Sequence, residues 1–317
     1  MAAQTGLLRR SPRPSLAALT LILAVLSSHL HARSLTVEVY RGGYASVNSF
    51  IISNGHEVAV IDVQRKVSEA AKLADIVRSK NLPLVYILIS HGHTDHFTGM
   101  AYFHSAFPEA RIVVANAQIK QDIRNYARYM DQGGATAGEP ALDPSLREIS
   151  AANPGGFDYE RCIEVLRKPR LSLPSGGTLE LDAGYPPTEA PHMTTVYSKD
   201  LNALFLADLG YNDVHLWLGD DATSARIAAW RGQLLRIRSH YRALNPTVYP
   251  GHGEPTDLAL LGRMIAYLDD FVSVTNHASS ALAAQQEMRR RYPSYREADF
   301  FLKYSVEHFV PGAAPGP

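Results

Sequence analysis

The sequence predicts an α/β protein in which layered β-sheets are covered by helices. Two observations carry this prediction: short β-rich runs occur in two sets along the chain, and segments with helical spacing lie between and after them. Sheets and helices that are apolar on one face bury those faces against each other, and layers are the stable arrangement. The chain has 317 residues, of which 46% are hydrophobic, which is enough for one large domain or two small ones.

The first set of strands lies between residues 35 and 115. The predicted strands cover residues 35–40, 49–53, 57–61, 84–89 and 111–115. The pair Asn54-Gly55 separates the second strand from the third and is a signal for a tight hairpin turn. The fourth run is almost wholly apolar, as expected of a strand buried on both faces. Apolar residues at helical spacing predict helices over 67–80 and 118–130.

A segment of different composition precedes the second set of strands. Residues 132–160 are rich in Gly, Ala, Pro and Asp, which predicts a long, partly irregular insertion with a lid as one role for it. The strands after it cover residues 171–173, 178–181, 194–197, 203–206 and 247–249. An amphipathic helix is predicted over 221–241, and Thr256 is expected to cap another. Helical spacing then continues, so residues 261–317 are expected to form a C-terminal helical extension.

The first residues have the features of a secretory signal peptide. Arg9, Arg10 and Arg13 precede an apolar run over residues 16–26, and Ala32 is a small residue before a polar stretch. The run is short for a bilayer span, so a retained membrane anchor is the less favoured alternative. We therefore expect a signal peptide over 1–32, a main domain over 33–260, and a secreted or periplasmic protein without stable membrane insertion.

Charge and cysteine content narrow the classes of partner. Basic and acidic residues number 31 each, so the formal net charge is zero and no nucleic-acid or anionic-membrane surface is indicated. A small-molecule substrate is the expected partner, and the sequence leaves the oligomeric state unknown. Cys162 is the only cysteine of the chain, so the fold depends on its core or on bound metal and not on an internal disulfide.

The strongest functional signal is SHGHTDHF, which directly follows the strand predicted at 84–89. The segment holds His91, His93, Asp95 and His96, in the kind of loop that commonly carries functional groups. Imidazole and carboxylate ligands suit zinc and its first-row neighbours, and this spacing can serve two adjacent sites. The alternative is a polar loop that happens to be rich in histidine. It is less favoured, because single histidines are common and such clusters are not.

Further ligands must come from other strand ends, and three residues occupy such positions. His192 lies just before the strand predicted at 194–197, Asp208 follows the one at 203–206, and His252 stands between two glycines after the last. Taken singly, each of the three is as readily a cap or a turn residue.

Taken together and in this order, these residues resemble the ligand pattern of the metallo-β-lactamase superfamily over residues 35–260. The family's His-x-His-x-Asp-His signature is matched by the SHGHTDHF segment. The resemblance implies an αββα sandwich that makes residues 33–260 the catalytic domain, with two zinc ions at one edge of the sheets. It assigns His91, His93 and His192 to the first ion, Asp95, His96 and His252 to the second, and Asp208 as a bridge. Asp62 matches the acid that supports the metal loop in this family. Residues 191–194 depart from the family's Gly-His-Thr-Pro type of motif.

The implied chemistry is hydrolysis. Two ions held in this way lower the pKa of the water that bridges them to about 7. The resulting hydroxide attacks a carbonyl or phosphoryl centre. Asp95 is expected to orient the reacting group or relay a proton. Asp208 stands where β-lactamases of the family usually carry Cys or Ser, so a small ester, lactone or amide is the expected substrate. A periplasmic β-lactamase, a phosphodiesterase and a non-catalytic metal-binding module are the alternatives.

Tyr211 is a further candidate for a catalytic role, because lactonases of this superfamily carry a tyrosine at the same offset from the bridging acid. A phenol at that place can donate a hydrogen bond to the oxyanion that develops in the reaction. The alternative is an aromatic residue that packs at the sheet edge.

Overall fold

The protein is seen in a computed structural model, which describes residues 1–2, 35–134, 142–219 and 222–310. The predicted signal peptide over 1–32 therefore falls almost entirely outside the described residues. Within the described ranges, no helix combines the length and the apolarity that a membrane span requires.

The first sheet contains six strands in the order β1-β2-β3-β4-β5-β6. Its strands are β1 (Thr36–Arg41), β2 (Asn48–Ser53), β3 (Val58–Ile61), β4 (Leu84–Leu88), β5 (Arg111–Val114) and β6 (Ile163–Val165). β1, β2 and β3 pair antiparallel, while β3 to β6 pair parallel. Parallel strands β4 and β5 are joined by a segment that begins with the loop 90–97, so this loop lies at the carboxyl end of β4 and at the edge of the sheet.

The second sheet contains five strands in the order β11-β10-β9-β8-β7. Its strands are β7 (Arg170–Ser172), β8 (Thr178–Asp182), β9 (Thr195–Ser198), β10 (Ala203–Asn212) and β11 (Thr247–Gly253). β7 to β10 pair antiparallel, and β11 lies parallel to β10. β10 and β11 both run further than the sequence predicts, because β10 is irregular in register and its polar residues interrupt the apolar pattern.

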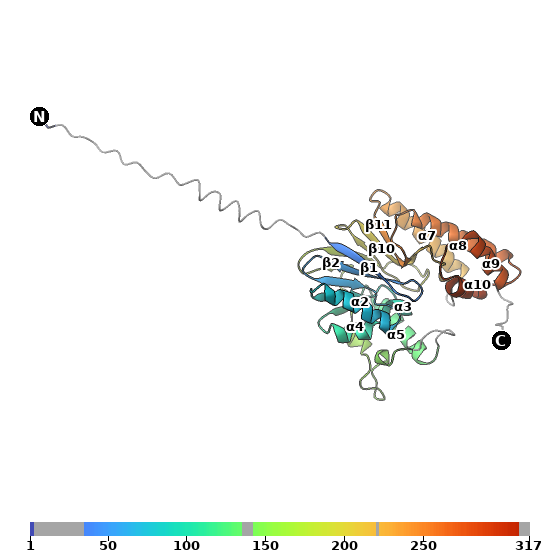
Figure 1. The fold of residues 1–317 in the computed structure, drawn as a ribbon, viewed down its shortest axis with the longest axis horizontal. Helices are drawn as coiled ribbons and strands as arrows, with labels where there is room; N and C mark the ends of the chain where they lie inside the picture. Colours follow the sequence, from blue (N-terminus) through green and yellow to red (C-terminus); the bar gives the residue numbers. More distant parts are fainter. Residues whose placement is uncertain (3–34, 135–141, 220–221, 311–317) are drawn as a thin grey trace. The chain divides into compact units, whose positions relative to one another are not determined.

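Helices cover both outer faces of the paired sheets (Figure 1). On the first sheet lie α2 (Val67–Ser79), α3 (Thr94–Phe97), α4 (Met100–Ala106) and α5 (Ala117–Asp131). On the second lie α7 (Ser224–Tyr241), α8 (Leu260–His277), α9 (Ala281–Arg291), the π-helix η3 (Ala298–Leu302) and α10 (Lys303–Phe309). Short turns are η2 (Pro144–Leu146) and α6 (Tyr159–Cys162). Between the sheets, residues such as Phe50, Ile61 and Phe205 form a shared apolar core. This is the predicted αββα arrangement, and the prediction is confirmed.

The helix predicted to begin at Thr256 begins later. Thr256 pairs through its backbone with Val248 of β11, and α8 begins at Leu260 with no side-chain cap at Ala259. The prediction that Thr256 caps this helix is wrong, because the chain stays extended beside β11 and turns only at Asp257, whose side chain accepts a hydrogen bond from the Ala259 N–H.

The described part of the predicted insertion packs against α5. Glu148 accepts hydrogen bonds from Arg124 and Arg128 of that helix, and Arg147 pairs with Asp131 at its end. Residues 142–160 thus lie on α5, whose other side chains reach the candidate site. Whether the segment acts as a lid stays a prediction.

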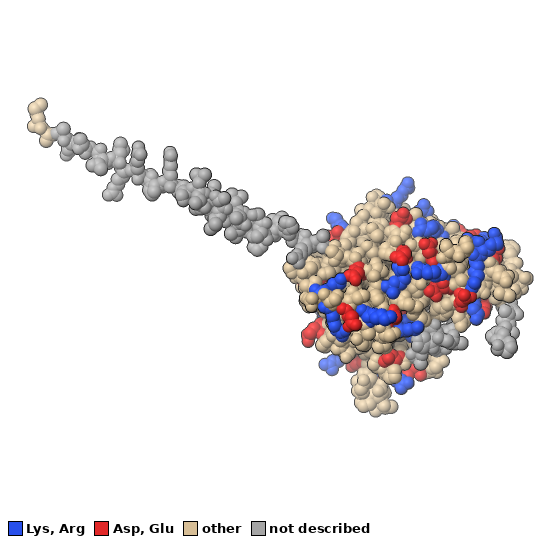
Figure 2. All heavy atoms as spheres, viewed as in Figure 1, with Lys and Arg blue, Asp and Glu red and all other residues tan. Residues whose placement is uncertain are grey.

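The C-terminal helices share one core with β10 and α7. Leu261, Phe271, Phe301 and Val306 belong to the same buried cluster as Trp230. Residues from Ser34 onward accordingly form one compact unit. On the face shown in Figure 2, basic and acidic side chains alternate without a large area of one sign.

Candidate metal centre

The candidate site lies where four segments meet at one edge of the two sheets. The loop after β4 supplies residues 91–96, the loop between β8 and β9 supplies Glu189, and β10 and β11 supply Asp208 and His252. The backbone brings the first two together, because Met193 pairs with His91 and the Thr194 N–H donates to the Ser90 carbonyl. Ligands that are distant in sequence are therefore held by the sheet framework.

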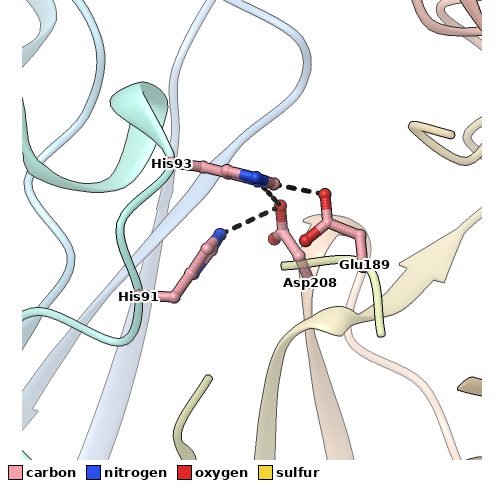
Figure 3. A group of neighbouring side chains, drawn as sticks. All are labelled: His91, His93, Glu189 and Asp208. Atoms are coloured by element: carbon pink, nitrogen blue, oxygen red, sulfur yellow. Dashed lines mark ion pairs between the residues drawn. The ribbon is translucent and has the colours of Figure 1, made fainter. Parts of the chain in front are cut away.

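The first group of possible ligands is His91, His93, Glu189 and Asp208 (Figure 3). His91 Nε2 lies 3.5 Å from Asp208 Oδ2, and His93 Nδ1 lies 3.0 Å from Glu189 Oε1 and 3.9 Å from Asp208 Oδ2. The imidazole and carboxylate atoms converge on one point, which is the geometry that a single cation needs.

The second group is Asp95, His96 and His252. His96 Nε2 and His252 Nε2 lie 3.7 and 3.6 Å from the two oxygens of Asp95. Asp208 touches this group too, with His96 Nε2 at 3.1 Å from Oδ1 and His252 Nε2 at 3.2 Å from Oδ2. Asp208 is thus the residue in contact with both groups.

Local backbone irregularity places Asp208. The register of β10 against β11 shifts on both sides of Ala207, whose φ of 46° lies in the left-handed region that non-glycine residues rarely adopt. A Cβ at Gly251 would meet Asp208 Oδ1 at 2.2 Å, so only glycine leaves room for this carboxylate. The bulge and the glycine together aim the side chain out of the sheet and into the site.

Hydrogen bonds behind the imidazoles orient them. His96 Nδ1 lies 2.8 Å from Asp62 Oδ2, and His252 Nδ1 lies 2.7 Å from the Ala45 carbonyl. In each ring Nδ1 donates a hydrogen bond on the side away from the site, which leaves Nε2 facing the site. Asp62 also accepts from the Ser90 N–H and hydroxyl at 2.8 and 2.7 Å. The structure therefore places Asp62 where the resemblance implied, behind the metal loop.

Four buried polar atoms at this point make no hydrogen bond of ordinary geometry among the described residues, although His96 Nε2 and Asp208 Oδ1 lie within ion-pair distance of each other. They are His91 Nε2, His96 Nε2, Glu189 Oε2 and Asp208 Oδ1. A buried polar atom without a hydrogen bond is destabilising, and four of them facing one place require an explanation. A donor set of imidazoles and carboxylates fits zinc and related first-row ions, so the residues present suit a metal site.

The pKa shifts of Asp208 and His96 also fit a metal site. Burial by itself raises the pKa of Asp208, but His96 and His252 outweigh it and hold the pKa well below the ordinary value. Burial lowers the pKa of His96, while Asp208 and Asp95 outweigh it and raise the pKa well above the ordinary value. The carboxylates of the two groups thus stay ionised and favour a positive charge beside them, which a bound cation would supply.

The structure brings together the predicted ligands with one exception. His192 lies outside both groups, with 39% of its side chain exposed and Nδ1 at 2.8 Å from Asp122 Oδ2 of α5. Glu189, from the same loop, takes a place in the first group and its side chain is fully buried. Arg226 of α7 holds this stretch by donating to the carbonyls of Thr188 and Glu189.

The sequence held only a weak signal for Glu189. It is an acid in the same loop as His192, and either residue type can bind a metal, so the family pattern alone favoured the histidine.

Tyr211 lies against the ligands. Its ring stacks on His252 with centroids 4.6 Å apart, and its hydroxyl lies 3.1 Å from Asp208 Oδ2 and 3.5 Å from Glu189 Oε1. Burial, Asp208 and Glu189 raise the pKa of the phenol well above its ordinary value, so the hydroxyl stays protonated and can donate.

Comparison with known proteins decides the family. The sequence pattern of the metallo-beta-lactamase superfamily matches residues 42–253, which include both ligand groups. The chain belongs to the metallo-β-lactamase superfamily. No curated protein matches it.

Several solved structures share the fold. A metallo-beta-lactamase from Pontibacter korlensis has a TM-score of 0.53 and 16% identity, covering 74% of this chain and 95% of its own. DIM-1 metallo-beta-lactamase exposed to ceftazidime has a TM-score of 0.50 and 15% identity over 74% of this chain and 91% of its own. The stereoselective inverting sec-alkylsulfatase Pisa1 from Pseudomonas sp. has a TM-score of 0.57 and 16% identity over 88% of this chain and 50% of its own. Superfamily membership makes the chain a metallo-hydrolase.

A cavity of about 400 Å³ opens beside the ligands of this superfamily member. His93, Asp95, Glu189, Asp208 and Tyr211 contribute to its wall. Thr94 of the histidine loop, the two residues Tyr44 and Arg65, helix α5 with Gly134 after it, the loop before α7, and Phe300 and Phe301 of the C-terminal extension complete the described part of the wall. The cavity gives a small molecule access to the ligand groups.

Proposed function

We propose that this protein is an exported hydrolase that uses two metal ions, zinc before other first-row metals, to cleave a small ester, lactone or amide. The observation that carries the proposal is the contact of Asp208 with both ligand groups, at 3.5 Å from His91 and 3.1 Å from His96. A carboxylate shared in this way supports two adjacent cations and not two separate sites.

His91, His93, Glu189 and Asp208 would hold the first ion, and Asp95, His96, His252 and Asp208 the second. His192, assigned to the first ion by family resemblance, is replaced by Glu189 in this proposal because of its bond to Asp122. When bound, the ions supply an activated water as nucleophile and polarise the bond that is broken.

Residues at the cavity wall would act on the substrate directly. The Tyr211 hydroxyl is protonated and faces the ligand groups, so it can donate to the oxyanion that develops on a carbonyl oxygen. Asp95 lines the same cavity with 11% of its side chain exposed, which lets it orient or relay a proton. Asp62 acts through the Ser90 and His96 side chains that it fixes.

The substrate class is supported by what the site contains. A carboxylate at Asp208, in place of Cys or Ser, favours hydrolases of esters, lactones and amides over β-lactamases. The mixed charges of the surface in Figure 2 support a small molecule over nucleic acid as the partner. A sulfate ester is a second candidate, because the fold likeness to the sec-alkylsulfatase spans 88% of this chain, against 74% for the β-lactamases.

Export is supported by the basic residues and apolar run that begin the sequence. The mature protein would then begin near residue 33. Its first residue, determined on material recovered from the medium or the periplasm, is the direct measurement. Recovery of a chain that still begins at Met1 would contradict export by a cleaved signal.

The test of the hydrolase proposal combines metal analysis with a substrate panel. Protein reconstituted with zinc and dialysed should retain two equivalents of metal and hydrolyse at least one member of a panel of lactone, ester, thioester, amide, phosphodiester, sulfate-ester and β-lactam substrates. Asp208→Asn should lose a metal ion and most of the activity, since the shared charge is removed. Asp182→Asn, at an exposed acid that pairs with Arg236, is the matched control. One equivalent of metal in the wild type, or an unchanged Asp208→Asn variant, would overturn the two-ion proposal.

A further inference from the structure

Three aromatic side chains stand together in the wall of the cavity that also exposes the ligand groups: Trp217, Phe300 and Phe301. The ring centroid of Trp217 lies 5.9 Å from that of Phe300 and 5.6 Å from that of Phe301, and the two phenylalanine rings lie 5.0 Å apart. Phe301 and His252 meet edge to face, with centroids 5.3 Å apart. We call the three residues the aromatic wall. It adjoins the second ligand group, to which His252 belongs.

An uncommon turn brings both phenylalanines to the cavity. In η3 the Leu302 N–H donates to the Glu297 carbonyl, five residues earlier, which is the hydrogen bond of a π-helix. Such turns are rare and are often found at functional sites. Glu297 has a φ of 62°, which is uncommon for a residue with a side chain, and its carboxylate accepts a hydrogen bond from the Ser46 hydroxyl at 3.0 Å. Two uncommon backbone features thus occur where Phe300 and Phe301 are placed in the wall.

Hydrogen bonds join the segment that carries Trp217 to the helices that carry the two phenylalanines. Before the tryptophan, the His215 backbone N–H donates to the Arg296 carbonyl. After it, the Leu218 backbone N–H donates to the Ser305 hydroxyl oxygen at 2.8 Å. These bonds lie on either side of Trp217 in sequence, and they connect it to the residues on either side of η3. The aromatic wall is therefore held as one unit, although its members come from two distant parts of the chain.

The aromatic wall is apolar and partly accessible. Trp217 and Phe300 are half-buried, so parts of both rings can be reached from the cavity. A Cβ at Gly219 would lie 2.1 Å from the Trp217 ring, so a glycine is needed where the indole crosses the chain. Transfer of a hydrocarbon group from water to aromatic side chains is favourable, and rings that packing already fixes lose little of this gain to ordering.

We propose that the aromatic wall binds a hydrocarbon group of the substrate, joined directly to the ester, lactone or amide that is hydrolysed. The proposal rests on the hydrolase function above and names the substrate class within it: compounds with an alkyl chain beside the scissile bond. The observation that carries it is the contact of Phe301 with His252, which places the wall directly beside the second ligand group. Trp217, Phe300 and Phe301 determine specificity here and take no part in the chemistry.

Substrates that differ only in chain length test the proposal by activity. Zinc-loaded protein is given the methyl esters and primary amides of butanoic, hexanoic and octanoic acids, and the γ-lactones that carry ethyl, butyl and hexyl groups. In each series that is hydrolysed, kcat/KM should rise by about tenfold for every two CH2 groups that become buried against the wall. Release of protons measures the hydrolysis of the esters and lactones, and release of ammonia measures that of the amides.

Phe300→Ala removes one ring of the aromatic wall. It should lower kcat/KM most for the longest chain and leave that for the shortest within a few-fold, so that the dependence on chain length flattens. A purely structural role would lower all chain lengths alike. Phe309→Ala is the matched control, because Phe309 packs on Phe271 in the same C-terminal core with ring centroids 5.4 Å apart and lies outside the described cavity wall. That variant should keep the dependence of the wild type.

A binding measurement separates this proposal from the hydrolase proposal. Methyl ketones with butyl, hexyl and octyl chains present the same hydrocarbon group beside a carbonyl, but they contain no bond that a hydrolase cleaves. Equilibrium dialysis against zinc-loaded protein should show an affinity that rises with chain length in the wild type and in Phe309→Ala, and a flatter dependence in Phe300→Ala. This result in a protein that hydrolyses none of the substrates would sink the hydrolase proposal alone. Hydrolysis at the same kcat/KM for every chain length would sink the present inference alone.

Two results would overturn the inference itself. One is a wild type whose kcat/KM and affinity fail to rise from the shortest chain to the middle one. The other is a dependence on chain length that survives unchanged in Phe300→Ala, since the chain would then bind elsewhere. If Phe300→Ala does not fold, Trp217→Ala decides, because it removes a different ring of the same wall. A flattened dependence in that variant supports the proposal, and an unchanged one contradicts it.

Discussion

The loop before β9 decides which side chain completes the first ligand group. Glu189 and His192 are three positions apart, yet Glu189 is buried against His93 while His192 turns outward to Asp122. Arg226 fixes the carbonyls of 188 and 189, and Thr194 is tied to Ser90. Hydrogen bonds thus hold the loop at residues 188–189 and at residue 194. In this arrangement the side chain of Glu189 points into the site, and that of His192 does not.

Replacing these two residues one at a time should separate their roles. Glu189→Gln keeps the size of the side chain but removes its charge. The ion held by His91, His93, Glu189 and Asp208 should therefore lose affinity. The loss should exceed the roughly tenfold that removal of a hydrogen-bond partner behind a metal ligand costs. His192→Gln should leave metal binding within a few-fold of the wild type. Titration of metal-free protein with zinc measures both. The reverse order of effects would return His192 to the ligand set.

Tyr211 offers a test that leaves the metals in place. Tyr211→Phe removes the hydroxyl near Asp208 but keeps the ring that stacks on His252. Loss of one oxyanion donor typically lowers kcat by about 100-fold. Metal content and melting temperature, measured on the same samples, should stay close to those of the wild type. An unchanged kcat would reduce Tyr211 to a packing residue.

At the level of elements, the residues after β10 join the second sheet to the C-terminal helices. His215 is buried, its Nδ1 lies 2.8 Å from the Tyr267 hydroxyl of α8, and its backbone N–H donates to the Arg296 carbonyl. Burial, with a smaller effect of Arg289, lowers the pKa of His215 to about 4. The imidazole is therefore neutral in the folded protein at pH values where it would be protonated in the unfolded chain.

This difference predicts a specific pH dependence of stability. The unfolded chain binds a proton at His215 below its ordinary pKa of 6.5, and the folded chain does so only near 4. Stability should therefore fall as the pH decreases through this interval, by about 3 kcal/mol at most. His215→Phe should remove that part of the slope. Urea denaturation of metal-free wild type and variant across this pH range measures it, and equal slopes would contradict the assignment.

Some helices and strands, and part of the candidate site, could be predicted from the sequence alone. Strands β2, β3 and β4 and helix α5 were predictable because their apolar residues follow one clear period, and the histidine cluster because its ligands are contiguous. β10 was predicted too short, since the bulge at Ala207 breaks the alternation and places Asp208 and Tyr211 inside the strand. Glu189 could not be distinguished from His192, because burial of a loop residue depends on contacts with α7 that no local pattern encodes.

At the level of the whole molecule, the C-terminal extension belongs to the core that carries the site. Leu261, Phe271, Leu302 and Val306 are all nearly inaccessible to solvent and pack in one cluster with Trp230. Each such side chain contributes about 1.5–3 kcal/mol when buried, which together is comparable to the whole stability of a domain.

A chain that ends at residue 259 should therefore fail to fold. We expect insoluble material, or soluble protein without a cooperative unfolding transition, because the outer face of β10 and α7 would be exposed. A chain that ends at residue 310 is the control and should unfold cooperatively. Circular dichroism during thermal unfolding distinguishes the two. A stably folded chain of residues 33–259 would show that the extension is a separate addition.

The distance in sequence between the histidine loop and two aromatic residues of the cavity wall has a consequence for biosynthesis. Phe300 and Phe301 leave the ribosome about two hundred residues after the histidine loop. Segments fold in the order in which they are made only as far as their partners already exist. The cavity wall is therefore complete only after α8, α9 and η3 have been made and have packed on β10 and α7, so substrate binding has to wait for the folding of the C-terminal segment.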